Sequence, residues 1–193
     1  HNLLQFGLMG SALSKGILGV ENPRIGLLSI GEEEGKGNSL VKEAYELFKM
    51  AGNIGFTGNA EGRDLFTGDF DVVVCDGFVG NVVLKLSEGL GSSFAHLLKR
   101  EMLDSSLVAR IGSLLTRGAS KRFSRLLDYA EYGGAPLLGL SHIALVCHGA
   151  SNAKAITSAV KMAATYIRNA TNQHIVASIT ATEELTDFSK ASS

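Results

Sequence analysis

The sequence predicts an α/β protein: a Rossmann-like, three-layer sandwich with a parallel sheet between helices. Three apolar runs are too short for helices and indicate strands buried on both faces; they are Ile25–Ile30, Val72–Cys75 and His142–Cys147. After each run, apolar residues recur three or four positions apart, which is the spacing of a helix packed on a sheet. A Gly-rich turn stands between each run and its helix.

The three turns share an asparagine at the expected helix start. Asn38, Asn81 and Asn152 are each expected to be an N-cap. A helix start offers free backbone N–H groups and the positive end of the helix dipole, which favour an anion. Because the turns after parallel strands lie at one edge of a sheet, we expect the three starts to face one crevice. The alternative is that Asn and Gly only punctuate these loops.

Length and composition indicate a globular domain with a substantial core. The chain has 193 residues, of which 45% are hydrophobic and 19% charged, and its net charge is −1. This balance excludes a largely disordered chain and gives no general reason to expect nucleic acid. The two cysteines both end apolar runs, which favours free thiols in a reducing cytosol. No apolar run approaches the roughly 18 residues of a membrane span.

The amino-terminal segment predicts an amphipathic helix that stops near Gly19. Pro23 separates it from the first strand. A helix that leads straight into a strand resembles a βαβ series entered in its middle. We therefore expect the chain to be part of a longer protein.

The loop after the first strand carries three consecutive acids and one lysine. Residues 32–34 are all Glu, for which the simplest interpretation is a solvated loop face. Lys36 lies between two glycines and two residues before Asn38, where an ammonium can reach an anion held at the helix start. An exposed lysine without a function is the alternative.

A polar turn follows the strand-like segment Asn53–Asn59. It contains Glu61, Arg63 and Asp64. An arginine with two acids nearby favours a structural ion-pair cluster over substrate binding.

Residues 105–127 form a basic, amphipathic segment that contains no acidic residue. Gly112 and Gly118 favour two short helices, a protruding helical pair, over one long helix. The pair packs on the body or on a second subunit in one interpretation, and touches an anionic membrane surface in the other. Its basic residues are Arg110, Arg117, Lys121, Arg122 and Arg125.

His148 directly follows the third predicted strand. That position suits proton transfer or phosphate binding, and equally a simple bond to the backbone. No His, Cys and Asp cluster has the spacing of metal ligands, so neither a metal nor a cofactor is expected. We expect the α/β domain to span residues 1–180, with residues 181–193 as a flexible tail.

Four blocks of sequence resemble one bacterial family. They are RIGLLSIGEEEGKGN, GNAEGRDLFTGDFDVVVCDGFVGNVVLKLSEG, DYAEYGGAPLLG and ALVCHGASNAKAI. They resemble the phosphate acyltransferases of phospholipid synthesis, and the resemblance extends to about Ala170. Members of that family have an amino-terminal portion with a glycine-rich acidic motif that this sequence lacks. The resemblance therefore implies the carboxy-terminal portion of such a chain.

The resemblance implies transfer of a fatty acyl group from acyl carrier protein to inorganic phosphate, giving acyl phosphate for phosphatidic acid synthesis. It implies a cytoplasmic homodimer, in peripheral contact with the inner face of the membrane or free of it. Its fold would be related to phosphotransacetylases and isocitrate-type dehydrogenases, and its product would pass to a membrane glycerol-3-phosphate acyltransferase. The catalytic positions fall on Lys36 and Asn81, and the substrate- or phosphate-binding positions on Gly37, Asn38, Asp76, Gly80, His148, Ser151 and Asn152.

The residues themselves fit this chemistry. Phosphate must attack a thioester carbonyl, so the site has to hold the dianion and stabilise a developing oxyanion. No Ser-His-Asp or Cys-His set is evident, and Cys75 ends a buried run, so we expect direct attack without an acyl-enzyme. Two alternatives stay open. One is a relative of isocitrate-type dehydrogenases, and the other is a non-catalytic, dimerising fragment that binds acyl carrier protein or membrane.

Overall fold

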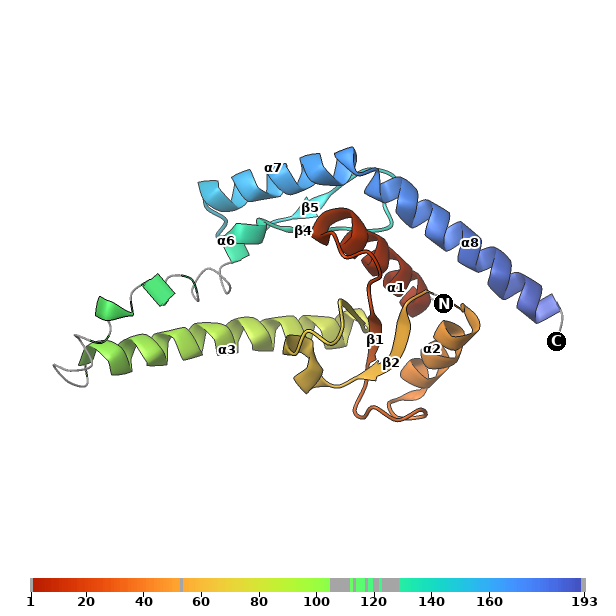
Figure 1. Cartoon of the computed structure of the whole chain (residues 1–193), viewed down its shortest axis with the longest axis horizontal. Helices are drawn as coiled ribbons and strands as arrows, with labels where there is room; N and C mark the ends of the chain where they lie inside the picture. Colours follow the sequence, from red (N-terminus) through yellow and green to blue (C-terminus); the bar gives the residue numbers. More distant parts are fainter. Residues whose placement is uncertain are drawn as a thin grey trace. The chain divides into compact units, whose positions relative to one another are not determined.

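The computed structural model describes residues 2–52, 54–104, 112, 114–116, 118–119, 122 and 129–191. Figure 1 shows its helices and strands. The chain divides into two compact units. Unit 1 comprises His1–Asp76, Ala135–Val146 and Val160–Ser193, and unit 2 comprises Gly77–Gly134 and Cys147–Ala159.

Unit 1 is built on a parallel sheet of three strands with the order β2-β1-β3. The strands are β1 (Ile25–Leu28), β2 (Phe56–Ala60) and β3 (Val72–Val74). Leu27 of β1 lies opposite Asn59 on one side and Val74 on the other. The α/β class and the first two predicted strands are confirmed, because both apolar runs pair in parallel.

Two helices of unit 1 share one core with this sheet. They are α1 (Asn2–Leu13) and α2 (Ser39–Met50). The Phe48 side chain of α2 is fully buried, and its ring stacks on that of Phe56 with centroids 4.8 Å apart. A Cβ added to Gly7 of α1 would lie 2.6 Å from the Phe48 ring, so α1 can pack this closely only with glycine there. Full burial of a side chain such as Phe48 contributes about 1.5–3 kcal/mol.

A second core cluster lies along α1 and α8 (Thr171–Ala191), which pack against each other in unit 1 (Figure 1). The α1 helix continues as a π-helical turn, η1 (Ser14–Leu18), and ends at Gly19 as predicted. Residues 181–191 continue α8, and Thr182 within it is buried and donates to the Ser178 carbonyl. The domain boundary at residue 180 and the flexibility of the tail stay predictions.

The third predicted strand, His142–Cys147, is not part of the parallel sheet. Only β5 (Leu145–Val146) forms, and it pairs antiparallel with β4 (Ala135–Pro136) in a sheet of two strands. The Leu137 N–H donates to the Ala144 carbonyl at 2.9 Å and continues this hairpin. An apolar run indicates a strand but gives neither its partner nor its direction, which is why the parallel assignment was wrong.

Unit 2 contains α3 (Gly77–Asp104), α6 (Tyr129–Tyr132) and the first half of α7 (Ala153–Arg168), which ends in unit 1. Within unit 2, the α6 end packs on the α7 start, where the Lys154 ammonium lies 2.7 Å from a Glu131 oxygen. Gly133 is buried there with φ of 84°, and any Cβ would collide with the α7 backbone at Ala155 and Ala159.

Most of the basic segment lies outside the described residues. Arg110, Arg117, Lys121 and Arg125 belong to the residues that are not described, whereas Arg122 is described and exposed. In the part of the chain that the structure describes, no helix is both long and apolar enough to cross a membrane.

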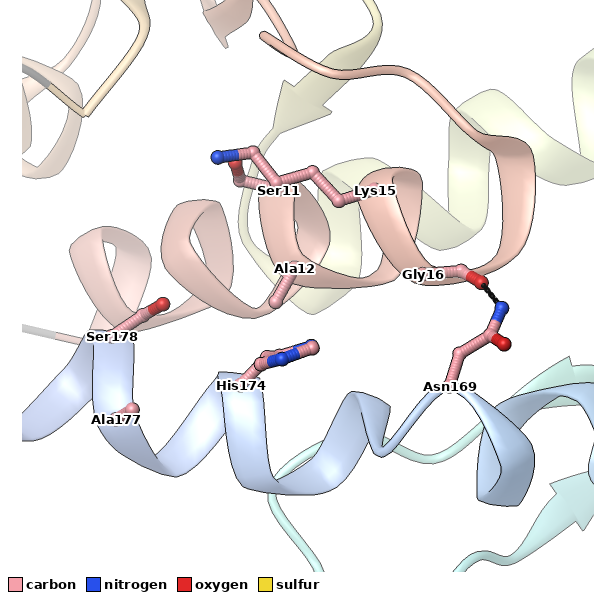
Figure 2. Close-up of a pocket in the computed structure, with 8 residues that line it drawn as sticks. All are labelled: Ser11, Ala12, Lys15, Gly16, Asn169, His174, Ala177 and Ser178. Carbon is pink, nitrogen blue, oxygen red and sulfur yellow. Dashed lines mark hydrogen bonds between the residues drawn. The ribbon is translucent and has the colours of Figure 1, made fainter.

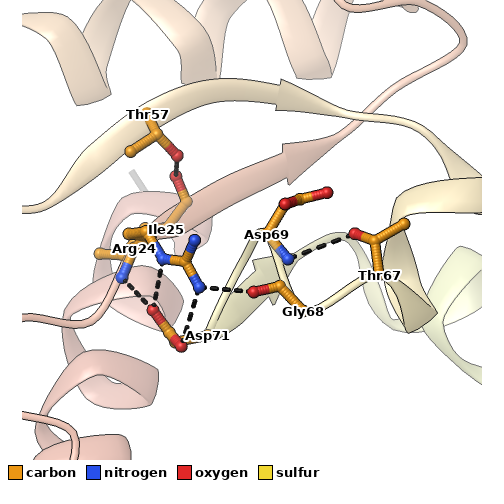
Figure 3. Close-up of polar contacts among 7 residues, drawn as sticks. All are labelled: Arg24, Ile25, Thr57, Thr67, Gly68, Asp69 and Asp71. Carbon is orange, nitrogen blue, oxygen red and sulfur yellow. Dashed lines mark hydrogen bonds and ion pairs between the residues drawn. The ribbon is translucent and has the colours of Figure 1, made fainter.

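An ion pair joins the beginnings of β1 and β3 (Figure 3). The backbone N–H and the Nε of Arg24 donate to Asp71 Oδ2 at 2.9 and 3.0 Å. The Arg24 carbonyl in turn accepts from the N–H groups of Asp71 and Val72. The hydrogen bonds from Arg24 hold the pKa of the Asp71 carboxyl below its usual value. This pair therefore fixes the register at which the two strands start.

We predict that Asp71→Asn lowers the melting temperature near pH 7, and that its difference from the wild type disappears in acid. Because the pKa of Asp71 is lower in the folded state, its stabilisation is complete above the ordinary carboxyl pKa and is lost as pH falls through the folded-state value. Thermal unfolding from about pH 7 to about pH 2.5 measures this, with the gap closing below about pH 4. Asp69→Asn is the matched control, and a gap that persists in acid contradicts the prediction.

Candidate functional site

The Lys36 loop, residues 29–38, connects β1 to α2. Its backbone at Gly37 packs closely against the first turn of α2. Asn38 is the N-cap of α2, as predicted, and its Oδ1 accepts from the Val41 N–H at 2.9 Å. Gly37 has φ of 99°, and a Cβ there would lie 2.8 Å from Val41 Cγ1. Lys36 is exposed. The loop thus presents a cation beside first-turn N–H groups that have no partner within the helix.

Three consecutive glutamates hold this loop in place. The Arg63 guanidinium lies 2.8 Å from Glu32 Oε1. The Glu33 carbonyl accepts from Asn59 Nδ2 at 2.9 Å. Glu34 accepts from the Tyr45 hydroxyl at 3.1 Å and from Lys49 Nζ at 3.2 Å. The acids are exposed, as a solvated face predicts, but two of them form ion pairs that sequence reasoning missed.

The predicted ion-pair cluster around Arg63 is confirmed. Arg63 contacts Glu61 at 2.8 Å and Asp64 at 3.7 Å, both within or next to the short helix η2 (Gly62–Phe66). Its contact with Glu32 extends the cluster to the Lys36 loop. The sequence places Glu32 at the start of the loop after the neighbouring strand, but no local pattern specifies that Arg63 contacts this acid.

The contact between Glu34 and Lys49 favours the charged form of both side chains. The hydrogen bond from Lys49, followed by that from Tyr45, lowers the pKa of Glu34. The same contact raises the pKa of Lys49. Both partners are therefore charged near neutral pH, and the loop stays attached to α2.

Asp76 lies at the same edge of the sheet as the Lys36 loop. It follows β3, and β3 is the parallel neighbour of β1, so both strands end at this edge. Cys75 precedes it, and burial, with a smaller contribution from Asp76, raises the pKa of the Cys75 thiol. A thiol that stays protonated is a poor nucleophile, which supports the prediction that Cys75 is not catalytic.

Asn81 does not cap a helix. The α3 helix begins at Gly77, so Gly80 and Asn81 lie inside its first turns, and the prediction of an N-cap at Asn81 was wrong. Residues 77–80, which were predicted to belong to a glycine-rich turn, form the first turn of α3 instead. Asn81 is exposed, which leaves its side-chain amide available to a ligand.

His148, Ser151 and Asn152 form one turn before α7 in unit 2. His148 Nδ1 accepts from the Ala150 N–H at 3.1 Å, which places the proton of a neutral ring on Nε2. The Ser151 N–H donates to the His148 carbonyl. Asn152 Oδ1 accepts from the Ala155 N–H at 3.0 Å, so the predicted cap is confirmed. The backbone bond foreseen for His148 is also present.

The predicted site residues thus fall into two groups. Lys36, Gly37, Asn38 and Asp76 lie in unit 1, where the sheet gathers them at one edge. Gly80, Asn81, His148, Ser151 and Asn152 lie in unit 2. The single crevice expected for all of them stays a prediction. The turn before α7 does not belong to the edge of the parallel sheet, because β5 lies outside that sheet.

A surface pocket that the sequence did not predict lies between α1 and α8 (Figure 2). Its volume is about 440 Å³, and Lys15, His174 and Ser178 are among the residues that line it. Among the predicted site residues that the structure describes, none lines this pocket. Asn169 closes one end by donating to the Gly16 carbonyl.

The structure defines an α/β protein in which an exposed lysine, Lys36, lies in a glycine-rich loop at one edge of a parallel sheet. Residues 1–174 match the family described as fatty acid synthesis protein, and the chain belongs to that family.

Several relatives carry the name phosphate acyltransferase. That of Nitratidesulfovibrio vulgaris (strain DP4) is 68% identical over 191 residues, 99% of this chain and 55% of the relative. That of Lawsonia intracellularis is 58% identical over 97% of this chain and 54% of the relative. That of Aquifex aeolicus is 51% identical over 91% of this chain and 51% of the relative. The chain thus spans about half the length of these relatives.

We predict opposite effects on stability at the two asparagines. Asn38→Ala removes an N-cap and should lower the free energy of unfolding by about 1 kcal/mol. Asn81→Ala replaces an exposed residue inside a helix with the best helix former and should not lower it. Thermal or urea unfolding of both variants makes the comparison. Equal destabilisation would show that Asn81 has a structural role that its position in α3 does not indicate.

Proposed function

We propose that this chain contributes the phosphate-handling part of a phosphate acyltransferase, which transfers a fatty acyl group from acyl carrier protein to inorganic phosphate. The observation that carries the proposal is the exposed Lys36 between Gly35 and Gly37, at the Asn-capped start of α2. A cation beside helix-start amides suits a dianion. The relatives' shared name supports an acyl transfer to phosphate, and the family description supports a fatty acyl group.

The reaction needs little beyond positioning and charge. A phosphate oxygen attacks the thioester carbonyl carbon, and an oxyanion develops on the carbonyl oxygen. The carbon–sulfur bond then breaks, the carrier-protein thiolate leaves and takes up a proton, and acyl phosphate remains. In this proposal Lys36 and the amides at the α2 start hold the phosphate, while the Asn81 amide donates to the oxyanion. Gly37, Asp76 and Gly80 contact the bound substrate or phosphate, as does the turn of His148, Ser151 and Asn152.

The finer fold and pathway assignments belong to the same proposal. Unit 1 supplies a parallel sheet with α1 and α2, which suits a Rossmann-like three-layer sandwich related to phosphotransacetylases and isocitrate-type dehydrogenases. Acyl phosphate is a mixed anhydride and hence an activated acyl donor. It would serve a membrane glycerol-3-phosphate acyltransferase that makes the precursor of phosphatidic acid. Peripheral contact of Arg122 and its basic neighbours with an anionic membrane would shorten that transfer.

We predict that Lys36→Ala and Asn81→Ala each lower turnover about 10²–10³-fold, because each removes a group aimed at negative charge in the transition state. The assay measures acyl phosphate formed from acyl-acyl carrier protein and phosphate. It uses this chain joined to the remaining part of the Nitratidesulfovibrio vulgaris relative. Lys42→Ala is the matched control, since Lys42 is an exposed lysine on α2, the helix that follows the Lys36 loop.

Two outcomes would decide against these roles. Near-normal turnover of both variants would remove Lys36 and Asn81 from the site. Slow turnover with a much lower melting temperature would show that the residues only hold their segments in place.

Assembly as a homodimer is a further part of the proposal, and the surface of α3 supports it. Large apolar side chains on this helix are more than half exposed, including Leu84 at 63%, Leu86 at 60% and Leu90 at 62%. The polar residues Asn81, Lys85, Glu88 and Ser92 follow one stripe at helical spacing, so the apolar residues share the remaining surface. Contiguous exposed apolar surface of this kind marks an interaction site, and a second copy is the simplest partner.

We predict that light scattering at micromolar concentration gives twice the monomer mass of 20.3 kDa for this chain. Leu86→Glu with Leu90→Glu should convert the dimer to a monomer, because the substitutions place charge in a buried contact. Ser92→Glu, on the polar stripe, is the control and should remain dimeric. A monomeric wild type would count decisively against the dimer and would favour another cover for α3.

A further inference from the structure

The Lys36 loop is attached at three consecutive residues to three different elements. Glu32 is bound by Arg63 of η2, the Glu33 carbonyl by Asn59 of β2, and Glu34 by Tyr45 and Lys49 of α2. The loop that carries the proposed phosphate-binding lysine is therefore not a free surface loop. Its conformation is set by side chains that sit on the scaffold.

One of these attachments shares an acceptor with the backbone N–H of Lys36. The Glu33 carbonyl accepts both from Asn59 Nδ2 at 2.9 Å and from the Lys36 N–H at 3.2 Å. Asn59 is 5% exposed, so its hydrogen bond is shielded from water. The preceding residue, Glu32, forms an ion pair with Arg63, which also forms ion pairs with Glu61 and Asp64. A single exposed ion pair contributes little, but an arginine held by several carboxylates loses less freedom on forming one more contact.

We propose that Glu32 is a positioning residue for phosphate capture: through Arg63 it holds the Lys36 loop in its anion-binding conformation without touching the anion. The inference rests on the proposed function of Lys36. When a loop binds only in one conformation, the apparent affinity falls by the fraction of time spent outside it. Loss of the Glu32 contact should therefore raise the KM for phosphate and leave kcat nearly unchanged.

A positioning role and a merely solvated acid predict opposite changes in phosphate affinity when Glu32 is neutralised. A carboxylate on the loop repels a phosphate dianion, so its neutralisation alone would tighten phosphate binding. If Glu32 positions the loop, Glu32→Gln instead weakens binding even though it removes a negative charge. Glu33→Gln provides a matched control, because it makes the same charge change at the next residue, whose side chain forms no ion pair within the described part of the chain.

The experiment measures KM for phosphate and kcat in this chain joined to the remaining part of the Nitratidesulfovibrio vulgaris relative. We expect Glu32→Gln to raise KM about three- to tenfold with kcat within about twofold. Glu33→Gln should leave KM unchanged or lower it. Arg63→Gln should raise KM at least as much as Glu32→Gln, because it also removes the contacts with Glu61 and Asp64. The double variant should add no further rise to that of Arg63→Gln, since the Glu32–Arg63 interaction is already lost in the single variant.

A second readout needs no substrate. Hydrogen exchange of the Lys36 amide, followed by NMR in this chain, should accelerate in Glu32→Gln and not in Glu33→Gln, because only the first variant releases the loop. Glu32 is exposed, so its variant should fold even if Arg63→Gln does not.

The outcomes separate this inference from the proposed function. If wild type shows turnover that Lys36→Ala abolishes, but Glu32→Gln has an unchanged or lowered KM, the positioning role is overturned and the function stands. If Lys36→Ala has normal turnover, the function assigned to this loop fails, and the inference fails with it. Faster Lys36 amide exchange together with a raised KM in Glu32→Gln alone supports both.

Discussion

The position of β1 between β2 and β3 is the constraint on which the rest of unit 1 depends. Leu27 is opposite residues of both neighbours, so the ends of all three strands are fixed relative to one another. The hydrogen bonds between Arg24 and Asp71 set this register at the strand starts (Figure 3). At the other edge of the sheet, the same register brings the Lys36 loop beside the segment that ends in Asp76. A slip of one residue would turn every side chain of the strand to the other face.

Packing in the core fixes the positions of the helices relative to the sheet. Phe48 of α2 fills the space above the sheet, and Gly7 of α1 admits its ring at close range. Because the interior is closely packed, α2 cannot move along the sheet without opening a cavity, and neither can its amino terminus. The amino-terminal end of α2, beside Lys36, is thus positioned by apolar contacts about three turns away along the same helix.

The loop adds polar attachments where apolar packing ends. A surface loop alone would sample several conformations, and an exposed lysine would gain little from any of them. Here Asn38 fixes the helix start, while Glu32, Glu33 and Glu34 connect the loop to η2, β2 and α2. These attachments hold the backbone beside Lys36 in a defined conformation, as the proposed capture of phosphate requires.

The features that could be predicted from the sequence are local ones, whose cause lies within a few residues. Apolar runs gave the parallel strands β1 and β3, helical periodicity gave α1 and α2, and the caps Asn38 and Asn152 follow from a side chain that bonds three residues ahead. The Lys36 loop and the ion-pair cluster around Arg63 were predictable for the same reason.

Features that depend on residues far apart in the chain could not be predicted, because their partners are set by the folded structure. The run His142–Cys147 became a short antiparallel hairpin because its partner is β4. The glycine turn before Asn81 became helix, which moved that residue from a cap to an exposed helical position. The contact between Glu32 and Arg63 joins residues 31 positions apart, and no local pattern specifies which acid an arginine meets across neighbouring strands.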